Sequence, residues 1–140
     1  MRTIKRLLLL AASSAFSLLA SAASAQSSMH VTAVETAQLP RFCWTQLGVP
    51  GASGDDFRII DCGPSANHYC SSLIYILRAK HQANKRGRFY LLANADIDLR
   101  YTEGSIAPYP NCSIRQHVQG TRVELEHLMR VYGYNRPRTK

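Results

Sequence analysis

Four cysteines constrain this 140-residue chain more than any other feature of its sequence. They are Cys43, Cys62, Cys70 and Cys112. An even number of cysteines in a small exported chain favours disulfides, and four cysteines allow three pairings. Each disulfide adds about 2–4 kcal/mol to the free energy of unfolding, which is a large share of the stability of a domain this small. We therefore expect a disulfide-stapled domain.

The first 25 residues have the pattern of an export signal. Three basic residues lie among the first six, an apolar stretch broken by Ser13 and Ser14 follows, and Ala23-Ser24-Ala25 has the small-x-small form that signal peptidase cleaves after. Cleavage there leaves residues 26–140, with 14 basic residues, nine acidic residues and a net charge of +5. An uncleaved N-terminal anchor is the alternative, which the short stretch disfavours. We expect a periplasmic location, with secretion as the alternative.

Residues 26–65 are expected to form a loop-rich N-terminal segment. Residues 26–38 are polar and weakly patterned, so an extended or disordered start is predicted. Residues 39–46 can form one or two turns of helix with Pro40 at an early position. Trp44, the only tryptophan, is expected to fill the core. Glycine and proline mark loops at residues 48–56 and 62–65.

Residues 66–133 are predicted to form a helical domain, followed by a basic tail at residues 134–140. A first helix is expected behind a cap at Ser65 or Asn67, running to about residue 84, with Gly87 ending it. Its apolar face is predicted from residues at helical spacing. These residues are Tyr69, Leu73 and Leu77.

Residues 88–105 fit either of two structures. A helix would bring apolar residues to one side and would pair Asp96 with Arg100 on the outer face. A strand is the alternative, because apolar and polar residues alternate from residue 97 to 102. The helical composition of residues 91–95 favours the helix. The expected apolar side consists of Phe89, Ala93, Ile97 and Tyr101, and it is widened by Tyr90 and Leu92.

The clearest amphipathic pattern follows Pro108-Tyr109-Pro110, which must break any helix. Asn111 is predicted to cap this last helix and Gly133 to end it. Its charged face allows the pairs Arg122–Glu126 and Glu126–Arg130. The apolar positions are Ile114, Val118, Thr121, Leu125, Leu128 and Tyr132. Three helices joined by short turns predict an all-α fold, a small antiparallel helical array.

The helix layout favours one cysteine pairing. Cys70 lies near the start of one helix, and Cys112 lies at the start of another that should run parallel to it. Those two could meet at one end of the bundle, and Cys43 with Cys62 would then join the N-terminal segment to the loop before the first long helix. A zinc site at Cys62, His68 and Cys70 is the alternative, but its spacing matches no common structural pattern. We expect no metal and no cofactor.

The helix–turn–helix, the Tyr109-Pro110-Asn111 break and the next amphipathic helix resemble a tetratricopeptide-repeat unit. The stretch from Asp96 to Thr102, with Pro110-Asn111 after it, is similar to the second helix and repeat end of bacterial proteins of this family. The resemblance covers about residues 66–132, or about one and a half units. It implies a helical-hairpin fold of the kind that binds peptides or partner proteins. Some segments also resemble small exported proteobacterial proteins, which implies no activity: Arg41-Phe42-Cys43-Trp44, Asn67-His68-Tyr69-Cys70 and Tyr109-Pro110-Asn111-Cys112.

No catalytic constellation is recognisable in the sequence, and we expect no enzyme. His68 could be a metal ligand or a general base, but a capping or partly buried histidine is the favoured interpretation. On a helix, Asp96 and Asp98 point in different directions and make a poor acid–base pair. The sequence has no phosphate-binding loop, zinc-protease motif or calcium loop.

A set of basic residues is predicted to gather at one end of the helical hairpin. A solvated basic surface is the favoured interpretation, and a site that binds an anion or an acidic partner is the alternative. Behind an export signal, the anion would be an acidic protein or a membrane surface contacted weakly, and not a nucleic acid. The leading hypothesis is an exported module that binds a protein or peptide. The alternatives are an inhibitor or immunity-type protein against an envelope enzyme, and a metal-binding protein or enzyme using His68. The basic residues are Lys80, Lys85, Arg86, Arg88 and Arg100.

Overall fold

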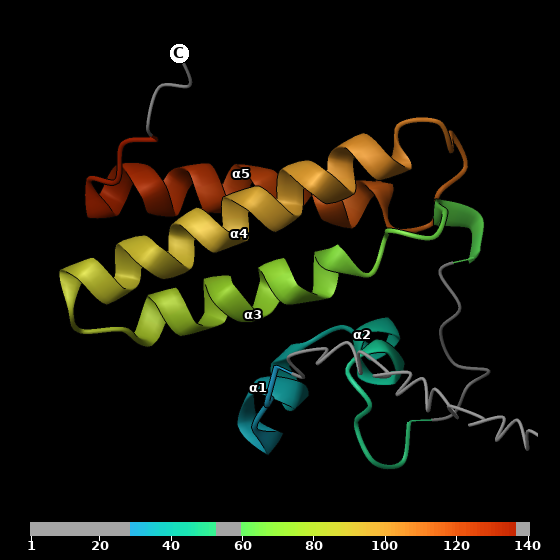
Figure 1. The fold of residues 1–140 in the computed structure, drawn as a ribbon, viewed down its shortest axis with the longest axis horizontal. Helices are drawn as coiled ribbons and strands as arrows, with labels where there is room; N and C mark the ends of the chain where they lie inside the picture. The colour runs from blue at the N-terminus through green and yellow to red at the C-terminus, as the bar shows by residue number, and fades with distance from the viewer. Residues whose placement is uncertain (1–28, 53–59, 137–140) are drawn as a thin grey trace, which may run out of the picture.

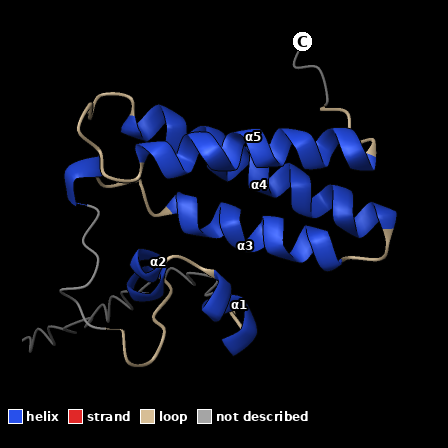
Figure 2. Cartoon of the chain, turned by 180° about the vertical axis from the view of Figure 1, so that it is seen from behind, coloured by secondary structure: helices blue, strands red, loops and turns tan. Residues whose placement is uncertain are grey.

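The computed structural model describes residues 29–52 and 60–136 of the chain, and these residues are all-helical, with no strand among them (Figures 1 and 2). Three long helices form the main body: α3 (His68–His81), α4 (Lys85–Ile106) and α5 (Arg115–Tyr132). The helices α3 and α4 make an antiparallel hairpin, and α5 runs back along α4. The prediction of a small, disulfide-stapled helical array is confirmed.

The short elements precede this body. Helices α1 (Ala33–Gln38) and α2 (Arg41–Gln46) lie on the side of α3 away from α5, and a single 3-10 turn, η1 (Ile60–Cys62), leads into α3 (Figure 1). Helix α2 starts directly after Pro40, as predicted. No helix in the described ranges has both the length and the apolar character needed to span a membrane. The predicted signal sequence lies outside the described residues.

Helix α3 lies at the centre of the fold, and two of its sides are therefore buried. Tyr69 and Ile76 belong to the core shared with α4 and α5, and the Tyr69 hydroxyl lies 2.8 Å from the Thr121 hydroxyl of α5. Cys70 and Ile74 belong to a second core shared with the N-terminal segment. A helix turns by about 100° per residue, so successive residues of α3 reach different layers.

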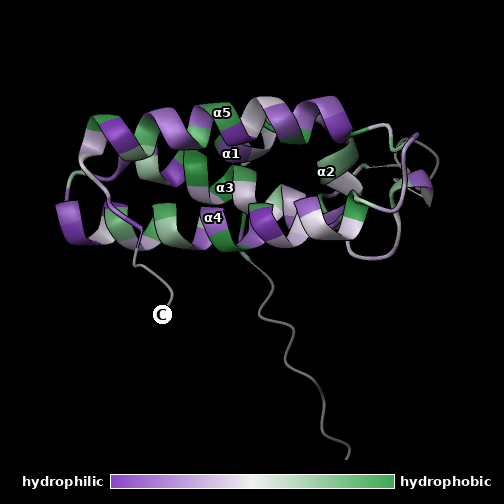
Figure 3. Cartoon of the chain, turned by 90° about the horizontal axis from the view of Figure 1, so that it is seen from above, coloured by the Kyte–Doolittle hydropathy of each residue, from purple (hydrophilic) through white to green (hydrophobic). Residues whose placement is uncertain are grey.

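Helix α4 covers the whole ambiguous stretch, so the helical interpretation of residues 88–105 is confirmed. The predicted apolar side is wrong in part, however: Leu92 is buried as expected, but Ile97 and Tyr101 are 57% and 52% exposed. The buried side contains Leu92 and Leu99, which lie at another phase of the same helix. Figure 3 shows hydrophobic turns interspersed with hydrophilic ones along α4 and α5. A helix with apolar residues at two phases does not reveal from its pattern which side faces the core.

Helix α5 buries one face of its amphipathic pattern, including Val118, Thr121 and Leu125, as predicted. It ends at Gly133, whose positive φ of 69° closes the helix with hydrogen bonds back to the carbonyls of Met129 and Arg130. The predicted cap at Asn111 is wrong, because the helix begins at Arg115 and no side chain caps it.

The turn between α3 and α4 also differs from the prediction. Helix α3 ends at His81, and the Asn84 side chain caps α4 by accepting hydrogen bonds from the backbone N–H groups of Arg86 and Gly87. Gly87 therefore lies in the first turn of α4 and does not end α3. Asparagine is among the strongest capping residues, and this signal competes with the glycine.

The N-terminal segment contains a helix that the prediction missed. Helix α1 begins with a capping box, in which the Thr32 hydroxyl accepts from the Glu35 N–H and the Glu35 carboxylate accepts from the Thr32 N–H. The Thr-x-x-Glu spacing is visible in the sequence and could have revealed it. Trp44 is partly buried against the second core, and its indole N–H donates to the Leu39 carbonyl.

The structure corrects the preferred disulfide pairing. Cys43 is joined to Cys70, and Cys62 to Cys112, across separations of 27 and 50 residues. Cys70 follows Tyr69, which faces α5, so the helical turn directs Cys70 toward α2. Cys62 ends η1, where its neighbour Asp61 also accepts a hydrogen bond from the backbone N–H of Ser113 at 2.7 Å. The first link ties α2 to α3, and the second ties η1, which precedes α3, to the turn that precedes α5.

Candidate interaction surface

Helix α4 presents large apolar and aromatic side chains to solvent along one side. Tyr90, Ile97 and Tyr101 are 65%, 57% and 52% exposed. Their spacing of seven and four residues places them on one face of the helix. We call these three residues the aromatic stripe. The opposite side of α4 is buried in the core through Leu92 and Leu99, and this packing fixes the position of the stripe.

His68 at the start of α3 extends the stripe toward the neighbouring helix. Its ring centroid lies 4.4 Å from that of Tyr101, and its Nδ1 lies 3.4 Å from a carboxylate oxygen of Asp98. The Tyr101 hydroxyl donates a hydrogen bond to the Ser65 hydroxyl at 3.5 Å. His68 is thus a partly buried histidine that packs against the stripe, as the favoured interpretation predicted.

A groove of about 540 Å³ opens between α1, the C-terminal end of α3 and the N-terminal part of α4. We call it the α1–α3 groove. Val34 of α1, which is 71% exposed, lies at its edge. None of the three stripe residues lines the groove; Leu91 does, and it points about 100° around α4 from its neighbour Tyr90, so the groove and the stripe lie on different sides of the same helix. Its main lining residues are Val34, Gln38, Leu77, Arg78, His81 and Leu91.

An ion pair holds α1 in place as a wall of this groove. The Arg78 guanidinium donates to the two Glu35 carboxylate oxygens at 2.5 and 3.2 Å, and it also donates to the His30 carbonyl at 2.6 Å. These hydrogen bonds lower the pKa of Glu35 to about 2, below its ordinary value of 4.5. The pair is charged at neutral pH, and it neutralises the carboxylate that lines the groove.

The five basic residues that were predicted to form one patch do not all lie together in the structure. Lys80 pairs with Glu124 of α5 at 2.5 Å. Arg88 lies over the Tyr132 ring, 4.2 Å from its centroid, and donates to the Gln82 carbonyl. Arg100 is about 20 Å farther along α4 than the first turn of that helix, since each residue advances the helix by about 1.5 Å. It pairs there with Asp96.

Two of the predicted basic residues remain exposed together at the α3–α4 turn. Lys85 and Arg86 form the first turn of α4, and no residue in the described ranges makes an ion pair with either of them. The Lys85 ammonium lies over the Phe89 ring, 5.4 Å from its centroid, and the residue is exposed. His81 at the end of α3 is also exposed and lines the α1–α3 groove. The positive end of the hairpin is therefore smaller than predicted and adjoins the groove.

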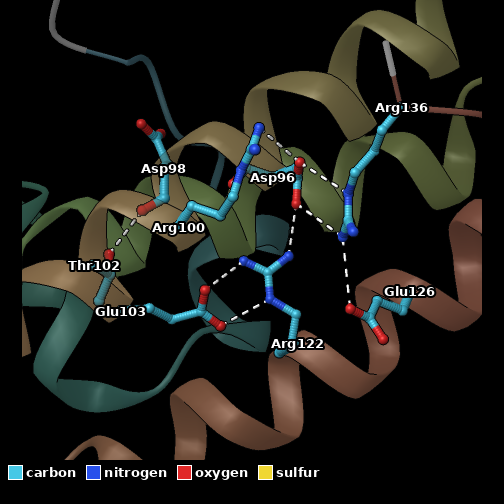
Figure 4. A network of polar contacts seen from close by, with 8 residues as sticks. All are labelled: Asp96, Asp98, Arg100, Thr102, Glu103, Arg122, Glu126 and Arg136. Carbon is cyan, nitrogen blue, oxygen red and sulfur yellow. Dashed lines mark hydrogen bonds and ion pairs between the residues drawn. The ribbon is translucent and has the colours of Figure 1, made fainter. Parts of the chain in front are cut away.

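Another group of charged residues forms a network between α4, α5 and the C-terminal residues (Figure 4). The Asp96 carboxylate is only 3% exposed and accepts from Arg122 at 2.6 Å, from Arg100 at 3.0 Å and from Arg136 at 3.1 Å. The prediction that Asp96 lies on the outer face is wrong. Two further carboxylates balance the cluster, so three arginines meet three acids. These are Glu103, bound to Arg122, and Glu126, 3.6 Å from Arg136.

This network replaces the predicted helical pairs on α5. Arg122 binds Asp96 and Glu103 of α4, and Glu126 binds Arg136. The start of the predicted basic tail therefore folds back onto the body, and Tyr134 packs edge-on against Phe89 with 5.3 Å between ring centroids. Because every charged group in the network has a partner, we assign it a structural role.

A metal centre at Cys62, His68 and Cys70 is contradicted by the disulfides, which consume both thiols. No other cluster of three or more metal-binding side chains occurs in the described ranges. Asp96 and Asp98 diverge as predicted, since Asp98 faces His68 and Asp96 faces Arg122. The groups that converge on the surface are therefore aromatic rings, aliphatic side chains and hydrogen-bonding groups suited to contact with another molecule.

Sequence reasoning missed the aromatic stripe, because it assigned Ile97 and Tyr101 to the core. The signal was present: α4 carries apolar residues at two phases, and only one phase can face the hairpin partner. No protein-family model, no curated protein and no solved structure matches this chain.

Proposed function

We propose that this protein is an exported interaction module that binds a segment of a partner protein across the aromatic stripe and the α1–α3 groove. The observation that carries the proposal is the aromatic stripe itself. Tyr90, Ile97 and Tyr101 leave more than half of their surface in water, at a cost that contact with a partner would remove.

The composition of the surface supports this proposal. Tyrosine is enriched at protein interfaces because its ring buries a large area at a small cost in side-chain entropy and its hydroxyl can bond to a partner. Two of the three stripe residues are tyrosines, and His68 and Asp98 add polar groups beside them. A groove lined by Leu77 and Leu91, on another side of α4 from the stripe, would receive apolar side chains.

The compartment belongs to the same proposal. Two disulfides are the pattern of a protein that folds in an oxidising compartment outside the cytoplasm. The basic, Ala- and Ser-rich N-terminus suggests the periplasm as that compartment. The resemblance to tetratricopeptide hairpins suggests the same kind of role, since those scaffolds bind peptides. We propose a scaffold without catalytic activity and without a nucleic-acid partner.

The experiment is a pull-down from periplasmic extracts with a stripe variant and a matched control. Ile97→Asp combined with Tyr101→Ser removes apolar contact on α4, whereas Val131→Asp places a charge at a 62%-exposed position of α5. We expect wild type and Val131→Asp to recover the same partner and the stripe variant to lose it, with all three showing the same thermal unfolding midpoint. Equal recovery by the three proteins, or no recovery in several growth states, would contradict the proposal.

A further inference from the structure

We infer that the segment bound in the α1–α3 groove is amphipathic and acidic, with its apolar residues in the groove and its carboxylates at the α3–α4 turn. This inference rests on the proposed function and specifies the partner.

The groove is suited to a few apolar side chains. Its volume of about 540 Å³ lies within the roughly 300–1,000 Å³ typical of sites that enclose small ligands. Leu77 and Leu91 are partly buried in its wall, and Val34 stands exposed at its edge. An amphipathic helix that lays one face into such a groove buries residues at helical spacing.

The charges around the groove favour an acidic ligand. The carboxylate that lines it, Glu35, is already bound to Arg78. Glu124 of α5 is bound to Lys80 of α3. His81, Lys85 and Arg86 at the α3–α4 turn are exposed and have no acidic partner in the part of the chain that the structure describes. A ligand with carboxylates at this end would gain complementary charge, and a basic ligand would be repelled.

The probes are two synthetic peptides of about 16 residues with the same leucine stripe, one with glutamate and one with lysine on its flanking positions. Binding to the oxidised protein is followed by fluorescence anisotropy at low and high salt. We expect the glutamate peptide to bind at least about tenfold more tightly at low salt, with the difference shrinking as salt is added. Mixing the protein with either peptide requires no knowledge of the natural partner.

Three variants locate the site. Lys85→Glu with Arg86→Glu is expected to weaken binding of the glutamate peptide about tenfold. Val34→Asp is expected to weaken both peptides, because it places a charge at the apolar edge. Arg130→Glu is the control: it alters charge at an exposed residue of α5 that lines a different pocket, and binding should not change beyond the general effect of net charge.

Equal binding of the two peptides, or an equal loss in Arg130→Glu, would overturn the acidic preference. If Val34→Asp leaves the affinity for both peptides unchanged, or if neither peptide binds, the groove is not the binding site. Self-association or attachment to anionic vesicles that depends on Val34 would assign the groove to a second copy or to a membrane and would also overturn the inference. In each case a partner lost with the stripe variant would still support an interaction module that binds through the aromatic stripe, and a partner retained by that variant would contradict the proposed function itself.

Discussion

The Glu35 carboxylate receives two hydrogen bonds from the Arg78 guanidinium across 43 residues of sequence. Glu35 also completes the capping box that starts α1. One side chain therefore both begins this helix and fastens it to α3, and it builds the wall of the α1–α3 groove.

The stability conferred by Glu35 should depend on pH. Its pKa is about 2 in the folded protein against 4.5 ordinarily, so the unfolded chain takes up a proton first as the pH falls. The stabilisation is complete above about pH 5 and is lost progressively toward pH 2. Because Arg78 is one-third exposed, we expect Glu35→Gln to cost only about 1 kcal/mol at pH 7.

Urea unfolding at a series of pH values checks this prediction. The difference in the free energy of unfolding between wild type and Glu35→Gln should be small near pH 2, grow up to about pH 5 and stay constant above that pH. Glu124→Gln is a matched control, because its carboxylate is 43% exposed and its ion pair should contribute less than about 0.5 kcal/mol. Parallel curves for wild type and Glu35→Gln would refute the role given to Glu35.

Loss of the Asp96 charge should destabilise the main body strongly. Asp96→Asn leaves Arg122, Arg100 and Arg136 without their shared carboxylate, and we expect a loss of about 2–4 kcal/mol. Asp98→Asn is the control two residues away, expected to cost about 1 kcal/mol or less. Chemical denaturation at pH 7 measures both, and equal losses would show that the buried network does not stabilise the fold.

The two disulfides should contribute similar, large amounts to stability. Paired alanine substitutions are expected to cost about 3–4 kcal/mol each, with Cys62 and Cys112 costing about 0.5 kcal/mol more because their loop is longer. Denaturant unfolding of the two double variants tests this order. Peptide mapping of the non-reduced protein tests the pairing, and a Cys43–Cys62 link would contradict it.

Two glycines should respond to alanine in opposite directions. Gly63 has a positive φ of 80°, and a Cβ there would lie 2.5 Å from the Tyr109 ring, so Gly63→Ala should cost about 2 kcal/mol. Gly104 lies within α4 with open space around it, so Gly104→Ala should add about 0.5–1 kcal/mol. Thermal unfolding of both variants measures these stability changes. A destabilised Gly104→Ala would mean that α4 needs this glycine.

Much of the main body could be predicted from the sequence, because local signals and the core agree there. The periodicity from Val118 to Leu125 and the stop at Gly133 predict α5 well. Competing signals caused the errors at other helix ends: Asn84 caps α4, so Gly87 does not end α3. The start of α1 was predictable from Thr32 and Glu35 and was missed.

The surface could not be predicted in the same way, since it depends on the phase at which each helix docks. Periodicity gives the spacing of Ile97 and Tyr101 and does not decide whether that face meets α3 or water. The disulfide pairing failed for the same reason, because Cys70 faces α2 while its neighbour Tyr69 faces α5. Long-range ion pairs such as Arg136 with Asp96 leave no local pattern in the sequence at all.

The most direct test of the account is site-specific photo-cross-linking in exporting cells, with the photoreactive residue placed at Ile97 or, as the control, at Val131. Both positions are more than half exposed, on α4 and α5 respectively. We expect a discrete cross-linked partner from position 97 that is absent from position 131 and is lost when Tyr101→Ser is added. Cross-links of equal yield and identity from both positions, or none from position 97, would contradict the claim that the aromatic stripe is the binding face.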